Sequence, residues 1–175
     1  MPDAAAEELA RVLATHEPAV TGINGARPAA DIVAATLARQ HGLQVTIAEH
    51  LRLFELTDLI PPPAAPGSWR PATLADRDLV EGWYDRFHAD ADAQAGRPPN
   101  PNPPTFAPRE LEARIEQGRI ALWLDAAGEP VHFTGHSVPA AGVVRVGPVY
   151  TPPAQRGHGY AAALVAQVSA DLLAA

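Results

Sequence analysis

Two proline-dense stretches interrupt this chain, and neither can continue a helix or a strand. The first, PPPAAPGS, covers residues 61–68, and the second, AGRPPNPNPPTFAP, covers residues 95–108. Proline lacks a backbone N–H and has a fixed φ angle, so repeated prolines break both helices and strand ladders. We therefore expect a stiff connector at 61–68 and a loop at 95–108. The connector divides the chain into residues 1–60 and residues 69–175.

The first part of the chain is expected to form a small α/β unit. The spacing of its apolar residues predicts one helix over residues 4–14 and a second that opens at Pro28 and stops at Gly42. A short strand is expected at 19–23, and a long strand in the stretch LQVTIAEHLRLFEL at 43–56. The apolar residues at helical spacing are Leu9, Val12, Leu13, Ile32, Val33 and Leu37.

The second part is expected to form a larger unit. A short strand at 69–72 leads into a helix for which Thr73 is the N-cap, with Asp76 three residues on. A further short helix follows the proline-rich loop, and a last helix covers 160–175. The expected helical stripes are Leu79, Val80, Trp83 and Phe87 in the first helix, Leu111 and Ile115 in the second, and Leu164, Val168 and Leu172 in the last.

Three strands are expected between these helices. They lie in RIALWLD, PVHFTGHSV and VVRVGPVYT, which start at Arg119, Pro130 and Val143. The turn signals AAGE and PAAG separate them. Because both turns are tight, the three strands should form an antiparallel meander.

Composition excludes several classes of function. The 175 residues include no cysteine, so the chain can form no disulfide, thiolate metal site or cysteine nucleophile. The formal net charge is −7 and no run of basic residues occurs, so we expect no nucleic-acid partner. No apolar run approaches the roughly 20 residues of a membrane span, and no signal peptide is visible. We therefore expect no membrane association and a cytoplasmic location.

The stretch VGPVYTPPAQRGHGYAAALV, residues 146–165, changes from a strand pattern to a helix pattern. Pro152 and Pro153 should end the strand, while Gly157 and Gly159 allow positive φ angles and leave the backbone uncovered. The first N–H groups of the following helix have no intrahelical acceptor, and the helix dipole favours an anion there by roughly 0.3–1 kcal/mol. A strand, a glycine loop and a helix N-terminus together predict a phosphate-binding site.

Three families of phosphate-binding loop compete for this stretch, beside the alternative of a plain strand-to-helix turn. A Walker loop requires a lysine, and the chain has none. GHGYAA matches the loose dinucleotide pattern G-x-G-x-x-A. However, five residues separate it from the strand, and no acidic residue follows about 20 positions later. A dinucleotide-dependent oxidoreductase therefore stays a distant alternative.

The third pattern fits better. Arg156, Gly159 and Ala161 stand as R-x-x-G-x-A, with Pro153 three residues before the arginine. This resembles the coenzyme A loop of the GNAT superfamily of N-acetyltransferases, and the element order from Trp69 to the end is also similar to that fold. VYTPPAQRGHGYAAAL looks most like a branch common in actinobacteria. The resemblance implies an α/β (α+β) fold with a mixed, mainly antiparallel sheet flanked by helices.

The resemblance further implies direct transfer of an acetyl group from acetyl-CoA to a small-molecule or peptide amine, without a metal. In the family, the backbone at the strand end bonds the acetyl carbonyl and the pantetheine arm, and the loop holds the pyrophosphate mainly through backbone N–H groups. Arg156 and His158 would add local positive charge. The cofactor-binding residues implied are Val149, Tyr150, Thr151, Arg156, Gly157, His158, Gly159, Tyr160, Ala161 and Ala162.

Acid and base catalysts are harder to assign. His132 and His136 are an even number of residues apart on one strand, so they should share a face, and the pKa of histidine suits a base. His136 is our candidate base and Tyr150 our candidate acid, although both histidines could be structural and Tyr150 could simply pack. Glu129 is expected to be a solvated turn residue. Acidic residues that could attract a cationic amine, or could simply be solvated, are Glu81, Asp85, Asp90 and Asp92.

The resemblance also implies elements beyond Ala175, and we expect that both ends of the chain are cut. The N-terminal unit would then be half of a degenerate second GNAT-like unit. The strand at 143–151 should be an open sheet edge, which favours a homo-oligomer. The main alternative to an enzyme is a non-catalytic module that binds CoA or mediates association.

Overall fold

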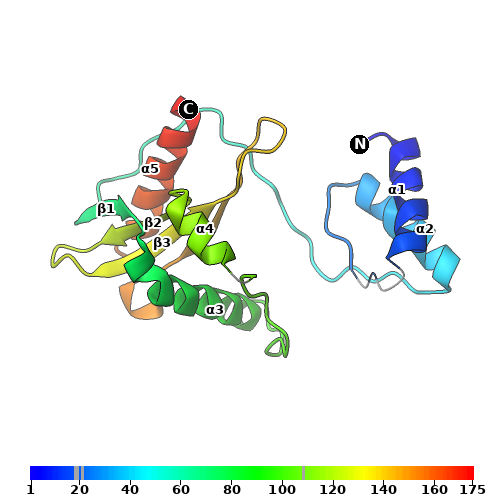
Figure 1. Cartoon of the computed structure of the whole chain (residues 1–175), viewed down its shortest axis with the longest axis horizontal. Coiled ribbons are helices and arrows are strands. Elements are labelled where there is room, and N and C mark those ends of the chain that lie inside the picture. Colours follow the sequence, from blue (N-terminus) through cyan, green and yellow to red (C-terminus); the bar gives the residue numbers. More distant parts are fainter. Residues whose placement is uncertain (18–19, 21, 108) are drawn as a thin grey trace. The chain divides into compact units, whose positions relative to one another are not determined.

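We describe a computed structural model of the chain, covering residues 1–17, 20, 22–107 and 109–175 (Figure 1). The chain divides into two compact units, Met1–Phe54 and Glu55–Ala175. The described residues form five α-helices and one four-stranded antiparallel sheet. No helix among them is both long and apolar enough to span a bilayer.

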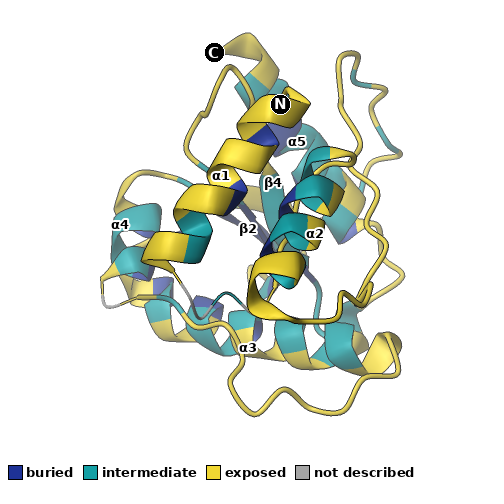
Figure 2. Cartoon of the chain, turned by 90° about the vertical axis from the view of Figure 1, so that its right-hand side faces the viewer, coloured by how far each residue is buried: buried dark blue, intermediate teal, exposed yellow. Residues whose placement is uncertain are grey.

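The smaller unit is a pair of helices, α1 (Asp3–His16) and α2 (Ala29–His41). Both predicted helices are confirmed, and Gly42 ends α2 with a φ of 66°. The apolar face expected on α1 is wrong at two positions, because Leu9 and Val12 are 40% and 45% exposed, whereas Leu13 packs against the buried cluster. Figure 2 shows that most of the surface of α1 is exposed. Ala6 and Ala10 are buried instead, since their small side chains let α2 approach closely. The buried residues are Ala6, Ala10, Val33 and Leu37.

The long strand predicted at 43–56 is wrong. These residues form no strand or helix, and their side chains are exposed. A strand needs a partner for its backbone N–H and C=O groups, and no described segment pairs with this one. Of the short strand predicted at 19–23, residues 19 and 21 lie outside the described residues, and the others are not in a strand. The described part of the small unit is therefore helical rather than α/β.

The larger unit follows the predicted order of elements. Its sheet has the order β1-β2-β3-β4 with every neighbouring pair antiparallel, so the expected meander is confirmed. The described sheet contains no parallel pair, so it is antiparallel and not mixed. The loop at 95–107 is irregular as expected, and Pro108 lies outside the described residues. The elements are β1 (Ser68–Pro71), η1 (Leu74–Asp76), α3 (Arg77–Gln94), α4 (Glu110–Glu116), β2 (Ile120–Leu124), β3 (Pro130–His136), β4 (Val146–Tyr150), η2 (Pro153–Gln155) and α5 (Tyr160–Ala174).

Helices cover both faces of this sheet (Figure 1). On one face, α3 and α4 pack against side chains of β2, β3 and β4, with Val80, Trp83 and Phe133 in the centre. On the other face, α5 packs Leu164 and Val168 onto β2 and β3. Leu79 of the predicted α3 stripe is 36% exposed, so that position of the stripe is wrong.

The predicted capping pair fixes the start of η1, the 3-10 turn that leads directly into α3. The Thr73 backbone N–H donates to Asp76 Oδ2 at 2.8 Å, and a capping box is complete. Arg70 of β1 donates to both carboxylate oxygens of Asp76, at 2.7 and 2.8 Å. These hydrogen bonds, led by those from Arg70, hold the pKa of Asp76 well below its usual range. The cap therefore fixes the direction in which α3 leaves β1 and crosses the sheet.

Each outer strand of the described sheet, β1 and β4, has one unpaired edge. β4 pairs only with β3 among the described strands, so the expected edge strand is confirmed. It is shorter than the predicted 143–151, because Val143 makes only an isolated bridge to Ala140. The turn through Ala141 and Gly142, both with positive φ, forms that bridge instead of extending the ladder.

Candidate functional site

The segment after β4 has the backbone conformation expected of an anion-binding loop. Pro152 and Pro153 end the strand, and Gly157 and Gly159 have φ angles of 84° and 81°, which confirms the predicted positive values. Ala163 is the first residue of α5 whose N–H bonds back along the chain, to the Gly159 carbonyl. The chain makes a hydrogen-bonded turn at Arg156 and Gly157, and the four backbone N–H groups that follow, those of residues 159–162, find no acceptor among the described residues. A row of unpaired donors at a helix start is suited to an anion.

A pocket of about 240 Å³ opens beside this loop along the free edge of β4. The end of β4 and the loop form one wall, and one side of α3 forms the other. Five of the predicted cofactor-binding residues therefore line one pocket, and residues of α3 line its opposite wall. The lining residues are Phe87, Asp90, Ala91, Gln94, Val149, Tyr150, Thr151, Arg156 and Ala161.

Asp90 connects the two walls of the pocket. Its Oδ2 accepts a hydrogen bond from the Tyr150 hydroxyl at 3.2 Å and forms an ion pair with the Arg156 guanidinium. Arg156 Nε donates to the Thr151 carbonyl at 2.9 Å, and its guanidinium carbon lies 5.9 Å from the centre of the Tyr150 ring. The positive charge of Arg156 is therefore already paired, and the unpaired backbone N–H groups are the available anion donors.

Tyr150, the candidate acid, is buried and lines the pocket. Burial raises the pKa of its hydroxyl, and the nearby Asp90 carboxylate adds to this effect. The hydroxyl stays protonated at neutral pH and directs its proton at Asp90.

His132 lies in the core rather than in the pocket. The side chain has no exposed surface. Its Nδ1 lies 2.7 Å from Thr151 Oγ1, and its Nε2 lies 2.8 Å from Thr134 Oγ1. Burial lowers the pKa of His132 to about 4, against a smaller opposing effect of hydrogen bonding with the Tyr150 backbone. The ring is neutral at pH 7 and is a weak base.

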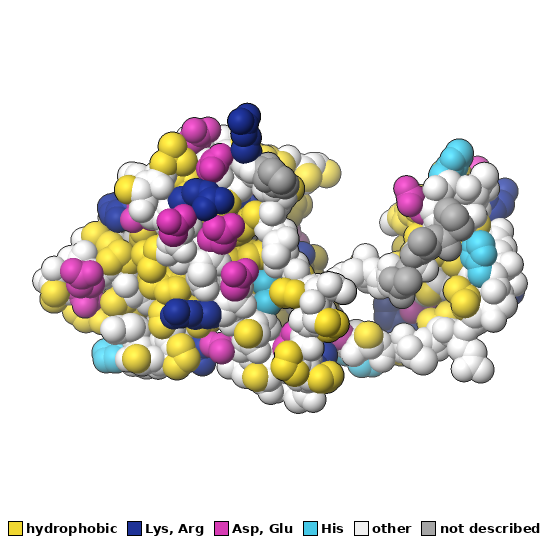
Figure 3. Space-filling model, turned by 60° about the horizontal axis from the view of Figure 1, so that its bottom comes forward, with side chains coloured by type: hydrophobic (Ala, Val, Ile, Leu, Met, Phe, Trp, Pro, Cys, Tyr) yellow, Lys and Arg dark blue, Asp and Glu magenta, His cyan; other side chains and the backbone are white. Residues whose placement is uncertain are grey.

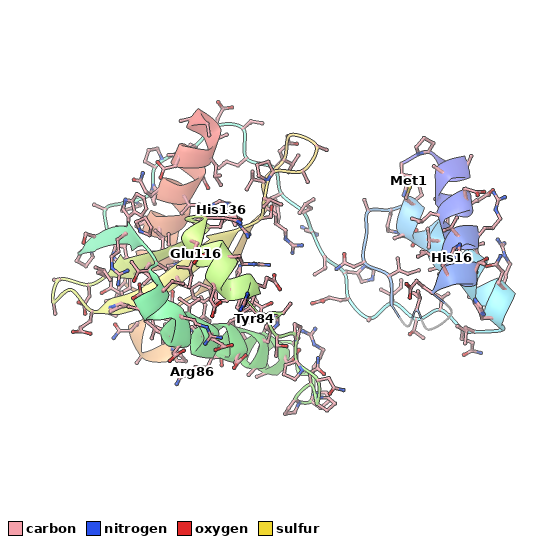
Figure 4. The ribbon with its side chains drawn as sticks, viewed as in Figure 1. Met1, His16, Tyr84, Arg86, Glu116 and His136 are labelled. Carbon is pink, nitrogen blue, oxygen red and sulfur yellow. The ribbon has the colours of Figure 1, made fainter. Side chains whose placement is uncertain are left out.

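His136, the candidate base, does not line the pocket. It pairs with Val146 at one end of the β3–β4 ladder, whereas Tyr150, which lines the pocket, pairs with Phe133 near the other end. Figure 4 shows His136 well apart from Tyr84 and Arg86 of α3, the helix that forms the opposite wall. The His136 Nδ1–H donates to the Ser137 carbonyl at 3.0 Å.

Of the four acidic residues that could attract an amine, only Asp90 faces the pocket. Glu81 pairs with Arg77, Asp92 pairs with Arg97, and Asp85 is exposed. On the face shown in Figure 3, arginine side chains stand among aspartate and glutamate side chains and form no basic patch. Glu129 is exposed in the turn before β3, as expected.

The rest of the loop lies beside the pocket. The His158 and Tyr160 rings are stacked, with centres 5.4 Å apart, and His158 Nδ1–H donates to the Gln155 carbonyl. A Cβ on Gly159 would meet only Ala65 Cβ, at 3.7 Å, although its positive φ makes a side chain there strained. Gly159 thus leaves open backbone next to the unpaired N–H groups.

Sequence reasoning missed the α3 wall. Phe87, Ala91 and Gln94 were not candidates, and Asp90 was one of several equivalent acids. Their spacing carried a signal, since residues 87, 90, 91 and 94 fall on one side of a helix. A second pocket, of about 140 Å³, lies between α3 and α4 and was not predicted. No group of three or more His, Asp or Glu in the described part of the chain is placed to hold a metal ion.

No protein-family model matches the chain, and no curated protein matches it.

Proposed function

We propose that this protein is an acetyl-CoA-dependent N-acetyltransferase of GNAT type. The observation that carries the proposal is the row of unpaired N–H groups at 159–162, which opens beside a pocket along the free edge of β4. The loop would bind the pyrophosphate of acetyl-CoA, and the pocket would take the acyl end. The R-x-x-G-x-A pattern at Arg156, Gly159 and Ala161 supports the same proposal.

The reaction is transfer of the acetyl group from sulfur to nitrogen. The ammonium form of the acceptor first loses one proton to solvent. The neutral amine nitrogen then attacks the thioester carbonyl, the carbon–sulfur bond breaks, the nitrogen loses a second proton and the thiolate gains one, so the products are an acetamide and CoA thiol. The Asp90 carboxylate is paired with Arg156, so it would bind the ammonium form of the acceptor where that group takes the place of the guanidinium. The Tyr150 hydroxyl would supply a proton to the thiolate, once contact with the ligand turns it away from Asp90.

Substitution at Gly159 tests the loop. Saturating acetyl-CoA, at 100 times its Kd, should stabilise the wild type by about 2.7 kcal/mol, which a thermal shift detects. Gly159→Val should abolish this shift, because its side chain lies where the pyrophosphate approaches. Gly128→Val is the matched control, since Gly128 also has a positive φ, of 85°, and no atom within 4 Å of an added Cβ, but lies in the β2–β3 turn. A Gly159→Val protein that keeps the full shift would refute the assignment.

A non-catalytic CoA-binding module is the second candidate. The position of His136 outside the pocket and the low pKa of His132 favour it, because neither histidine then serves as a base for the acceptor. An assay of CoA thiol release with a panel of amines distinguishes the two: binding without release supports the module. NAD in place of acetyl-CoA tests the oxidoreductase alternative in the same thermal-shift format.

A further inference from the structure

We propose that His132 is a positioning residue that orients the Thr151 hydroxyl as a hydrogen-bond donor toward a carbonyl oxygen of the ligand in the β4 pocket. This inference rests on the proposed function, because the carbonyl meant is an amide or thioester carbonyl of acetyl-CoA. It concerns a buried ring that contacts no ligand and acts through Thr151.

The starting point is the neutral state of the ring. His132 has no exposed surface, and the same is true of Thr134, which binds its Nε2. A neutral imidazole has one N–H, so one ring nitrogen donates and the other accepts. The two threonine hydroxyls must therefore play opposite roles toward the ring.

The hydrogen bond with Thr134, at the buried end of the series Thr134–His132–Thr151, determines which ring nitrogen carries the proton. In the described residues, His132 Nε2 is the one hydrogen-bond partner of the Thr134 hydroxyl. A buried donor left unpaired costs more than an acceptor with a free lone pair, so Thr134 donates its O–H to Nε2. The ring proton is then on Nδ1, and Nδ1–H donates to Thr151 Oγ1 across the 2.7 Å contact.

The consequence reaches the pocket. Thr151 lines the pocket, and its oxygen is occupied as an acceptor by Nδ1–H. Its own hydroxyl hydrogen is then free to donate to the ligand. The other tautomer would point the Thr151 hydrogen into the protein and present lone pairs, which suit an N–H group instead. The ring therefore selects a carbonyl oxygen at this position of the pocket.

Acetyl-CoA affinity, measured by calorimetry on the full chain, tests the proposal. Thr151→Val should weaken binding about three- to tenfold, the effect of one lost neutral hydrogen bond, and Thr151→Ser should restore most of it. His132→Leu should weaken binding to a similar degree, whereas His132→Asn, whose side-chain amide can donate from the Nδ1 position, should retain it. The double variant His132→Leu/Thr151→Val should bind no worse than Thr151→Val alone.

Thr134→Val is the matched control, because it makes the same chemical change at the other ring nitrogen, outside the pocket. The proton should stay on Nδ1 in this variant, since an unpaired buried N–H at Nε2 would cost more than a free lone pair there. It should lower stability but change affinity less than twofold. If it weakens binding as much as Thr151→Val, the effect is structural and the proposal fails. Should His132→Leu not fold, the Thr151 and His132→Asn variants decide the matter alone.

Nitrogen-15 NMR of histidine-labelled protein gives a second readout that needs no ligand. His132 should show a single neutral tautomer with the proton on Nδ1, and its signals are assigned with His132→Asn. A proton on Nε2 overturns the proposal even if acetyl-CoA binds. Wild-type protein that does not bind acetyl-CoA overturns the proposed function and the inference together, whereas binding that Thr151→Val leaves unchanged overturns the inference alone.

Discussion

At the scale of single residues, buried His132 links stability to pH. Its pKa is about 4 in the folded chain, against 6.5 for an ordinary histidine. Above pH 6.5 the ring is neutral in both the folded and the unfolded chain, so it has no effect. Between 6.5 and 4 the unfolded chain binds the proton and the folded chain does not. The free energy of unfolding should therefore decrease as the pH is lowered from 6.5 to 4, by about 3 kcal/mol in total.

Urea denaturation at several pH values between 7 and 4.5 checks this prediction. His132→Asn lacks the titrating ring, so its stability should vary less with pH than that of the wild type. The Asp76 carboxylate also titrates, but its lowered pKa removes stability only below its usual value of 3.8, outside this range. Equal pH dependence in the two proteins would mean that His132 is protonated or exposed in the folded state.

The sequence reveals those site residues whose role is local. Gly157 and Gly159 are predictable because a positive φ is a property of one residue and its neighbours. The ion pair between Asp90 and Arg156 joins residues 66 positions apart, and only the packing of α3 on the sheet brings them together. His132 was a candidate from its strand position, but its burial depends on α5, which covers that face of the sheet.

At the scale of elements, local pattern identifies a helix or strand better than it identifies its partner. The helices and the antiparallel meander were predictable because capping residues, periodicity and tight turns are encoded within each segment. Residues 43–56 show the limit, since strand-like composition supplies no partner for the backbone. In α1 the periodicity indicated the helix correctly, but the side that is buried against α2 carries Ala6 and Ala10, and Leu9 is exposed.

Two glycines should respond in opposite ways to the same substitution. Gly82 lies within α3 and an added Cβ meets no atom within 4 Å, so Gly82→Ala should stabilise the protein by about 0.5–1 kcal/mol through helix propensity. Gly135 lies in β3, where an added Cβ would come within 3.2 Å of the Gly147 carbonyl oxygen and 3.3 Å of Pro148 Cδ. Gly135→Ala should destabilise it by about 1–3 kcal/mol, because β4 would have to move away from β3.

Chemical denaturation of the two alanine variants measures both changes against the wild type. Each variant is the other's control for the effect of an added methyl group. A stabilising Gly135→Ala would indicate that β4 approaches β3 less closely than the contacts at Gly147 and Pro148 imply.

At the scale of the whole molecule, residues 43–56 end the first compact unit and begin the second. They are exposed and form no helix or strand. Arg52 lies in this stretch. Three other arginines, Arg27, Arg70 and Arg97, precede proline and so resist trypsin.

Limited digestion with trypsin should therefore cut first after Arg52, because a protease needs an extended segment that can leave its surroundings at little cost. The competing sites outside helices and strands in the larger unit are Arg109, Arg119, Arg145 and Arg156, but all four are tied into that unit. The Arg119 carbonyl accepts from the N–H of His136 at 3.0 Å, and Arg156 Nε donates to the Thr151 carbonyl at 2.9 Å. The Arg109 carbonyl accepts from the N–H of Ala113 at 3.0 Å, and the Arg145 carbonyl accepts from the N–H of Ser137 at 2.9 Å. Mass spectrometry should find two early fragments, and Arg52→Gln should remove them. An early cut after Arg109 or Arg145 instead would show that the larger unit opens more readily than the stretch around Arg52.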